Sequence, residues 1–378
     1  METLFWCAIG FIAYAYAGYP VALMLISFVR KRPVKKKSIT PSVSIVIAAY
    51  NEEKAIRQKL ENTLSLKYPR ENLEIVVASD CSSDQTDAIV KSFENRGVRL
   101  VRAPARNGKE AVQKLAVAAV SGDILVFSDV GTILPVDAVA NIVKNFADPT
   151  VGCVSSVDKI IDLDGKVSGE GAYVKYEMLL RRLETRVNTL VGLSGSFFAA
   201  RSEVCRNWQP ELQSDFNTLL NSVQMGLRGV SDPESVGYYK NISDETKEYE
   251  RKVRTVLRGI AVFMKSLSLL NPLRYGLFSW QLLSHKLCRW LVPFAMTAAF
   301  VSNALLIVTP FYLGLFLLQC AGYGIAFHAM WTNRLVESAL LKIPTYFVVV
   351  NMSILDAWLR YLRGDRVVRW NPSQREAS

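Results

Sequence analysis

Residues 43–49 read VSIVIAA and lead directly into Tyr50-Asn51-Glu52-Glu53. Two similar runs follow: LEIVVAS over residues 73–79, which ends before Asp80, and ILVF over residues 124–127, which ends before Ser128 and Asp129. Each run is short and aliphatic, and each precedes a segment with helical spacing, which is typical of buried parallel strands. The sequence therefore predicts an α/β domain with a doubly wound, mostly parallel sheet.

Each predicted strand brings a carboxylate to its C-terminal end, namely Glu52, Asp80 and Asp129. The C-terminal ends of parallel strands share one edge of the sheet, and α/β proteins bind nucleotides at that edge. Three acids at one edge predict a nucleotide site, which could include a metal ion. The alternative for Glu52 and Asp80 is that the acidic side chain caps the helix that follows.

An apolar segment precedes this domain. Residues 4–29 contain no charged side chain, and they are long enough to cross a bilayer about 30 Å thick. A basic run, RKRPVKKK, follows at residues 30–37. A cleavable signal peptide would carry its charges ahead of the apolar core. The observed order predicts an uncleaved anchor whose C-terminal side lies in the cytosol.

Three apolar stretches lie late in the chain. Residues 291–309 and 311–330 flank Pro310, contain no Asp, Glu, Lys or Arg, and predict a transmembrane hairpin. Residues 343–355 are short enough to be either a third span or an interfacial helix. The tail carries four arginines, Arg360, Arg363, Arg366 and Arg369. A cytosolic tail requires an even number of C-terminal crossings, so we favour two, in a multi-pass protein of the inner (plasma) membrane with a cytosolic catalytic domain.

These features divide the 378 residues into five parts. They are an anchor with its basic flank (1–37), a catalytic domain (38–250), amphipathic interface helices (251–289), a transmembrane hairpin (290–330), and a third membrane or interfacial segment with the tail (331–378).

The net charge is +11, and the basic residues gather beside the apolar segments, where they neutralise anionic lipid headgroups. No nucleic-acid-binding motif accompanies them, so we expect membrane lipids and no nucleic acid as partners. The six cysteines are dispersed singly, which suits reduced thiols, and the two histidines are too few for a His-rich metal site.

The combination of motifs resembles the membrane-bound family-2 glycosyltransferases of bacterial polysaccharide and lipid-linked glycan synthesis, whose catalytic domain has the GT-A fold. The resemblance covers roughly residues 41–290 and rests on residues 44–52, 78–86, 127–129, 192–198, 214–215 and 251–255. It implies an enzyme that uses a nucleotide-sugar donor, with a UDP-sugar favoured over a GDP-sugar.

The resemblance assigns donor binding to seven residues: Ala49, Asn51, Glu52, Asp80, Lys109, Asp129 and Arg254. Arg106 and Lys109 flank a glycine in a loop that suits a diphosphate, although a solvated turn would have the same sequence. Asp129 stands at the first acid of the DxD motif, while Gly131 replaces the second acid. The implied cofactor is Mg²⁺ or Mn²⁺ held by Asp129, the diphosphate and water.

Asp215 matches the general base that takes the proton of the acceptor hydroxyl; the alternative is an exposed aspartate at a helix start. The turn at residues 192–196 is expected to border the acceptor through Gly195 and Ser196, or to be a tight turn only. His285 is assigned to the acceptor, by a phosphate contact, in a segment whose Arg289 and Trp290 otherwise fit membrane-edge anchors.

Arg254 occupies the place of the arginine in the QxxRW motif of polysaccharide synthases, where Arg251 replaces the glutamine and Thr255 the tryptophan. The loss of the tryptophan counts against processive synthesis. We therefore favour an inverting enzyme that moves one sugar to a lipid-linked acceptor, a polyprenyl-diphosphate glycan, in envelope or exopolysaccharide assembly.

One alternative is a processive polysaccharide synthase that works as an oligomer or with partner subunits. The other is a catalytically weak homologue that acts as a membrane scaffold, which Gly131 suggests and the retained acids oppose. The sequence leaves the sugar, the linkage and the oligomeric state open.

Overall fold

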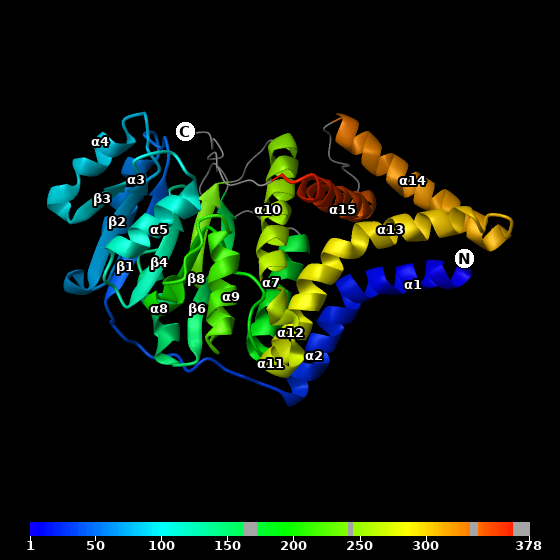
Figure 1. Cartoon of the computed structure of the whole chain (residues 1–378), viewed down its shortest axis with the longest axis horizontal. Coiled ribbons are helices and arrows are strands. Elements are labelled where there is room, and N and C mark those ends of the chain that lie inside the picture. Colours follow the sequence, from blue (N-terminus) through cyan, green and yellow to red (C-terminus); the bar gives the residue numbers. More distant parts are fainter. Residues whose placement is uncertain (162–171, 241–244, 333–338, 366–378) are drawn as a thin grey trace. The chain divides into compact units, whose positions relative to one another are not determined.

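The computed structural model describes residues 1–161, 172–240, 245–332 and 339–365 (Figure 1). The chain forms two compact units. Residues 26–241 form the first, which we call the α/β unit, and residues 1–25 with residues 242–366 form the second, which we call the helical unit.

The described part of the α/β unit contains an eight-stranded sheet with the order β3-β2-β1-β4-β7-β6-β8-β5. One half consists of four parallel strands, β1 (Val43–Ala49), β2 (Leu73–Ser79), β3 (Val98–Arg102) and β4 (Ile124–Asp129). The other half is mixed and contains β5 (Thr132–Ile133), β6 (Val151–Ile161), β7 (Phe197–Arg201) and β8 (Arg228–Lys240). β7 runs antiparallel to β4 and β6, β8 runs parallel to β6, and β5 runs antiparallel to β8.

Helices cover both faces of the sheet, which confirms the doubly wound prediction. On one face lie α3 (Ile56–Leu64), α4 (Thr86–Lys91) and α6 (Ala138–Val143). On the other lie α5 (Lys109–Ala119), α8 (Ser202–Cys205) and α9 (Ser214–Gln224). The unit also contains α7 (Ala172–Val187) and 3₁₀ turns at Arg70–Asn72, Glu94–Arg96 and Lys144–Ala147.

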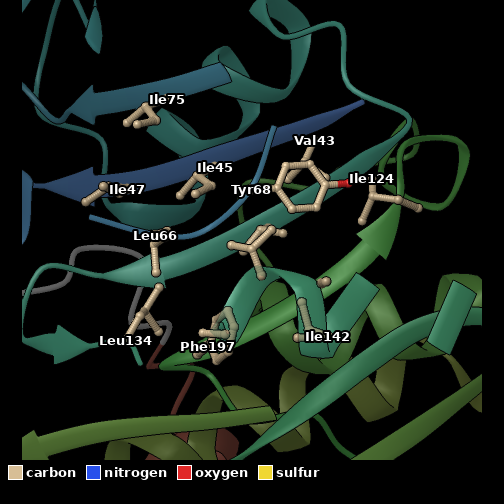
Figure 2. Close-up of a cluster of buried hydrophobic side chains, with 14 of the residues drawn as sticks. Val43, Ile45, Ile47, Leu66, Tyr68, Ile75, Ile124, Leu134, Ile142 and Phe197 are labelled. Atoms are coloured by element: carbon tan, nitrogen blue, oxygen red, sulfur yellow. The ribbon is translucent and has the colours of Figure 1, made fainter. Parts of the chain in front are cut away.

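Strand β1 shows why the sequence folds this way. All seven of its residues are buried. Val43, Ile45 and Ile47 point to the face covered by α3 and α6, as Figure 2 shows, whereas Val46 and Ala48 point to the face covered by α5. Full burial of one such aliphatic side chain contributes about 1.5–3 kcal/mol. A strand with apolar residues on both faces is therefore stable only in the centre of a two-sided domain.

The helical unit contains α1 (Glu2–Ala13), a π-helix at Tyr14–Gly18 and the first part of α2 (Tyr19–Val29). It continues with α10 (Glu245–Lys265), a 3₁₀ turn at Leu267–Leu270, α11 (Pro272–Tyr275), α12 (Leu277–Leu282) and a second π-helix at Leu283–Cys288. It is completed by α13 (Arg289–Ala304), α14 (Pro310–Thr332) and α15 (Ala339–Leu362).

Two helical stretches of the described chain, Glu2–Val29 and Pro310–His328, are long and apolar enough to cross a membrane. The first coincides with the predicted anchor and the second with one arm of the predicted hairpin. The number of crossings and the topology stay predictions. The predicted boundary at residue 250 falls inside α10, and Arg366 and Arg369 of the predicted tail lie outside the described residues.

Candidate active site

Asp80, the first residue after β2, holds a loop at the C-terminal edge of the sheet. Its side chain is 3% exposed, and its two carboxylate oxygens accept hydrogen bonds from the backbone N–H groups of Asn107 (2.9 Å) and Gly108 (2.8 Å). Gly108 has φ = 97°, a conformation that suits glycine, and it immediately precedes α5. Asp80 thus fixes the loop that leads into α5 and does not cap α4, the helix that follows it, and its contact with the nucleotide stays a prediction.

The ends of β1 and β2 are tied together at this edge. The backbone N–H of Asp80 donates to the carbonyl of Ala49, the last residue of β1, at 2.9 Å. Beside them, the guanidinium carbon of Arg106 lies 3.9 Å from the centre of the Tyr50 ring, close enough for a cation–π interaction. The loops that follow the two strands therefore form one surface.

Side chains join these loops further. Asn51 has φ = 51°, and its amide oxygen accepts from the backbone N–H of Ser83 at 2.8 Å. The backbone N–H of Glu52 donates to the hydroxyl of Thr86 at 2.8 Å. Burial alone would raise the pKa of Asp84, but hydrogen bonds from the hydroxyl and backbone N–H of Thr86 lower it. The loops are therefore preorganised around an ionised carboxylate.

Lys109 and Asp129 form an ion pair at the same edge. Asp129 is the last residue of β4, which extends two residues beyond the apolar run, and Lys109 is the first residue of α5. The Lys109 ammonium contacts Asp129 Oδ1 and lies 3.3 Å from the carbonyl oxygen of Gly195. Burial by itself would lower the pKa of Lys109, but the charge and hydrogen bond of Asp129 outweigh it and raise the pKa. The lysine is therefore charged at neutral pH.

Asp215 lies against the same glycine. It is the second residue of α9 and is 8% exposed, so it is not the exposed helix-start aspartate of the alternative reading. Its oxygens accept from the backbone N–H of Phe216 (2.7 Å) and the amide of Gln213 (3.2 Å). A Cβ at position 195 would lie 2.9 Å from Asp215 Oδ2, so glycine is what allows Gly195 to approach this closely.

The structure therefore brings together five of the residues assigned from the sequence: Lys109, Asp129, Gly195, Ser196 and Asp215. The carbonyl of Ser196 accepts from the backbone N–H of Asp129 at 3.0 Å, which ties the turn to the end of β4. One turn thus contacts both an ammonium–carboxylate pair and a second, separate carboxylate. This arrangement can bind a phosphate group on one side and remove a proton on the other.

Asp158 organises this turn and was not singled out from the sequence. It lies on β6 and accepts hydrogen bonds from the hydroxyls of Ser194 (2.5 Å), Ser196 (2.6 Å) and Ser156 (3.1 Å). An acid within a run of apolar and small residues was the available signal. The half-buried Ser196 hydroxyl is therefore held in place by Asp158, and its contact with an acceptor stays a prediction.

Lys59 is the second residue that sequence reasoning missed. It lies on α3 and is 2% exposed, and its ammonium donates to the hydroxyl of Ser128 (2.7 Å) and the carbonyl of Thr132 (2.6 Å). Burial lowers its pKa to about 7, although the charge of Asp129 acts in the opposite direction. The available signal was its spacing, because Lys59 shares the apolar face of the helix with Ile56.

The acids at this edge of the sheet determine whether a divalent cation can bind there. Among the described residues, no three His, Cys, Asp or Glu side chains gather closely enough to form a metal site. Asp129 supplies one carboxylate at this edge, and its side chain is 27% exposed. Mg²⁺ commonly binds through one or two protein carboxylates with substrate phosphates and water. The donor set therefore fits a cation whose other ligands come with the substrate.

Arg254 lies in the helical unit, on α10. Arg251 and Arg258 are placed three residues before it and four residues after it, so the three guanidinium groups share one face of the helix. Burial and these two like charges lower the pKa of Arg254. This cluster suits an anionic ligand, and the contact of Arg254 with the donor stays a prediction.

His285 also lies in the helical unit, in the second π-helix. Its ring is 5.9 Å from that of Tyr19, and it is 7% exposed. Arg289, one turn later, is 8% exposed and stacks 5.4 Å above the ring of Tyr16. Both side chains are therefore packed among helices rather than spread on the surface, as an edge anchor would be. The acceptor contact of His285 stays a prediction.

The chain shares this fold with glycosyltransferases. It superimposes on the mannosyltransferase PcManGT from Pyrobaculum calidifontis, solved in complex with GDP-Man and Mn²⁺, with a TM-score of 0.75 and 22% identity. The superposition covers 95% of this chain and 99% of that one. The fold is therefore that of the GT-A enzymes.

Residues 44–207 match the sequence profile of glycosyl transferase family 2, which identifies this part of the chain as a family-2 glycosyltransferase domain. It is 29% identical over 172 residues to the poly-beta-1,6-N-acetyl-D-glucosamine synthase of Staphylococcus aureus, over 44% of this chain and 41% of the synthase. It is 37% identical over 94 residues to the probable glycosyltransferase YdaM of Bacillus subtilis, over 24% of this chain and 22% of that protein. The match thus spans less than half of these relatives.

Proposed function

We propose that the protein is an inverting glycosyltransferase that moves one sugar from a nucleotide-sugar donor to a lipid-linked acceptor, a polyprenyl-diphosphate glycan, in envelope or exopolysaccharide assembly. The observation that carries this proposal is the turn at Gly195, which contacts the Lys109–Asp129 pair and the Asp215 carboxylate. Such a turn separates a site for the donor diphosphate from a base for the acceptor.

On the donor side, the nucleotide occupies the joined loops after β1 and β2, next to Asn51, Glu52 and Asp80. A UDP-sugar is favoured, and a GDP-sugar is the alternative because PcManGT was solved with GDP-Man. The diphosphate faces the Lys109 ammonium, and Arg254 provides a second, bidentate cation.

Asp129 is the residue that would hold Mg²⁺ or Mn²⁺. When bound, the cation neutralises the charge that develops on the leaving diphosphate. The Mn²⁺ of the PcManGT complex supports this assignment, and the single acid at positions 129–131 implies that donor phosphates and water complete the ligand set.

On the acceptor side, Asp215 takes the proton of the acceptor hydroxyl. The hydroxyl oxygen then bonds to the anomeric carbon from the face opposite the diphosphate. The bond between that carbon and the diphosphate oxygen breaks, and the nucleoside diphosphate leaves with the electron pair. Gly195 and Ser196 line the acceptor, and His285 contacts its phosphate. A positioned base of this kind contributes about 10²- to 10⁴-fold to the rate.

The acceptor assignment rests on membrane attachment. Two stretches could cross a membrane, and the basic run at residues 30–37 follows the first of them. We infer a multi-pass protein of the plasma membrane with its α/β unit in the cytosol. A lipid-linked acceptor would then reach the site from the membrane surface.

The test is nucleotide release by the full chain in nanodiscs, across a panel of UDP- and GDP-sugars, with and without Mg²⁺ or Mn²⁺ and with lipid extract as acceptor source. We expect release with one donor, only when lipid is present, and loss of release in Asp215→Asn. The matched control is Asp137→Asn, an exposed aspartate that directly precedes α6. If no donor in the panel gives nucleotide release and no nucleotide binds, the result would favour a catalytically weak homologue that acts as a membrane scaffold.

A processive synthase is the second candidate, because the chain is similar to poly-beta-1,6-N-acetyl-D-glucosamine synthase. It would require an oligomer or partner subunits to complete a polymer channel. Thr255, at the place of the synthase tryptophan, opposes it. Electrophoresis or mass spectrometry of the product decides between the two, since single transfer gives one added sugar and processive synthesis gives a ladder.

A further inference from the structure

Side chains of helix α3 form hydrogen bonds with the chain on both sides of the turn at residues 129–132. Lys59 and Asn62 lie three residues apart on this helix and therefore project from the same face. The Lys59 ammonium donates to the Ser128 hydroxyl at 2.7 Å and to the Thr132 carbonyl at 2.6 Å. Because Ser128 belongs to β4 and Thr132 to β5, one ammonium joins the two strands that bracket the turn.

Asn62 fixes the chain two residues further on. Its amide nitrogen donates to the carbonyl of Leu134 at 2.8 Å, and its amide oxygen accepts from the backbone N–H of Leu134 at 2.9 Å. Residues 128–134 are thus held at three points from one helix face. We call Lys59 and Asn62 the α3 clamp.

The turn held by the clamp is short and includes a glycine. Only Val130 and Gly131 separate Asp129, the end of β4, from Thr132, the start of β5. Gly131 has no side chain, and glycine has the largest backbone entropy to lose on folding. The orientation of the Asp129 carboxylate therefore depends on contacts from outside the turn.

A buried lysine is an energetically unfavourable choice for holding a turn, because its amino group must be desolvated. Burying a charged lysine carries a large desolvation cost, and an apolar residue of the same length would avoid it. The Lys59 amino group contacts Ser128 and Thr132 from inside the domain, while the Lys109 ammonium contacts the Asp129 carboxylate directly. The hydrogen bonds of Lys59 to the two strand ends, which an apolar residue could not make, are therefore what the turn gains from it.

We propose that Lys59 is a positioning residue of the donor site, which sets the orientation of Asp129 through the α3 clamp. The same helix follows the Asn51–Glu52 loop, so the clamp joins the nucleotide loop to the diphosphate end of the site. The effect on sugar transfer rests on the proposed function, whereas the effect on the turn does not.

The test compares Lys59→Met, which keeps the length and removes the amino group, with Lys114→Met on the exposed face of α5. We expect backbone hydrogen exchange in residues 128–134 to rise by about tenfold or more in Lys59→Met and to stay unchanged in Lys114→Met. We expect kcat/KM for the donor to fall by about 30- to 100-fold, with the KM for the acceptor unchanged.

Ser128→Ala provides a milder variant, since it removes one of the two hydrogen-bond acceptors of Lys59 and leaves the lysine in place. It should raise hydrogen exchange in residues 128–134 and lower donor kcat/KM by less than Lys59→Met does. It replaces Lys59→Met in the test if that variant fails to fold. Equal exchange of residues 128–134 in wild type, Ser128→Ala and a folded Lys59→Met would overturn the clamp.

The readouts also separate the two proposals. If the wild-type chain neither binds nor releases any nucleotide, the proposed function fails, while the exchange measurement still decides the clamp. If Lys59→Met only lowers the melting temperature and leaves donor kcat/KM per folded molecule intact, the lysine is structural and its positioning role is wrong.

Discussion

The two halves of the sheet build their polar sites in different ways. In the parallel half, the acids follow their own strands and are fixed by backbone groups at the same edge, as Asp80 is by Asn107 and Gly108. In the mixed half, the turn at 194–196 is fixed by side chains from distant strands, above all Asp158. The proposed donor side is thus a consequence of regular geometry, whereas the proposed acceptor side depends on particular long-range pairs.

This difference predicts that substitutions in the two halves change different kinetic constants. Changes in the parallel half should alter donor binding, and changes at Asp158 should alter acceptor binding. Lys109 and Gly195 lie where the halves meet, so substitutions there should have the largest effects.

The largest effect is expected for Lys109→Met. It removes the ammonium that contacts both Asp129 and the Gly195 carbonyl, and it leaves the Asp129 carboxylate without that partner at the proposed diphosphate site. We expect donor kcat/KM to fall by about 10²- to 10³-fold, by analogy with the loss of one electrostatic contact in an active site. Initial rates against donor concentration measure it, and Lys114→Met is the control. An unchanged donor kcat/KM would mean that the ion pair is only structural.

Gly195→Ala should come next. The new Cβ would lie 2.9 Å from Asp215 Oδ2, so either the turn or the carboxylate must move. Because small displacements of reacting groups are costly, we expect kcat to fall by about 10²-fold while donor affinity changes little. Gly97→Ala is a poor control because Gly97 has φ = 86°, whereas Gly10→Ala meets open space in a helix and is suitable. A kcat within twofold of wild type would contradict the close approach.

Asp158→Asn should have a smaller effect, confined to the acceptor side. It weakens the hydrogen bonds from Ser194 and Ser196 without removing bulk. Loss of charge from such bonds costs about 1–2 kcal/mol, so we expect a rise in acceptor KM of about tenfold at constant donor affinity. Calorimetric titration with nucleotide and rates against acceptor concentration give the two values. A loss of donor affinity would break the proposed division between the halves.

The smallest effect concerns stability. Burial lowers the pKa of Lys59 to about 7 in the folded protein, against 10.5 for an ordinary lysine. Between these pH values the unfolded chain binds the extra proton, so this group makes the free energy of unfolding rise with pH.

The slope from Lys59 should not exceed about 1.4 kcal/mol per pH unit, and Lys59→Met should lack it. Urea unfolding of the wild type and Lys59→Met between pH 7 and pH 9 measures the difference. Parallel pH dependences would show that Lys59 titrates normally.

The sequence predicts the parallel half of the sheet better than the mixed half. Strands β1 and β2 occupy the predicted residues because an uninterrupted aliphatic run with a following helix has few other solutions. β4 continues through Ser128 and Asp129, two residues beyond its apolar run, because backbone pairing with β1 extends to that point. The three acids at the sheet edge were predicted for the same reason.

Strand β8 was not predicted, because Asp232-Pro233-Glu234 interrupts it and proline normally marks the end or edge of a strand. The structure accommodates the interruption with a shift of register between Ser155 and Val157. Asp232 is buried and accepts hydrogen bonds from Lys36 and Asn145. Those partners are far away in the sequence, so no local pattern could reveal them.

The roles of Lys59 and Asp158 escaped prediction for the same physical reason. A lysine on the buried face of a helix and an acid within a strand each become informative only when their hydrogen-bond partners are known. Asp80 illustrates the converse. Its position at the sheet edge was predicted, while its two backbone partners, about 27 residues later, came from the structure.

If Asp215 is the base for transfer and the parallel half of the sheet binds the donor, the two functions can be separated by one substitution. The measurement compares donor affinity and lipid-dependent nucleotide release for wild type and Asp215→Asn in the same nanodiscs. We expect equal donor affinity and release slowed by about 10²-fold or more in the variant. Release at the wild-type rate by Asp215→Asn would show that Asp215 is not the base.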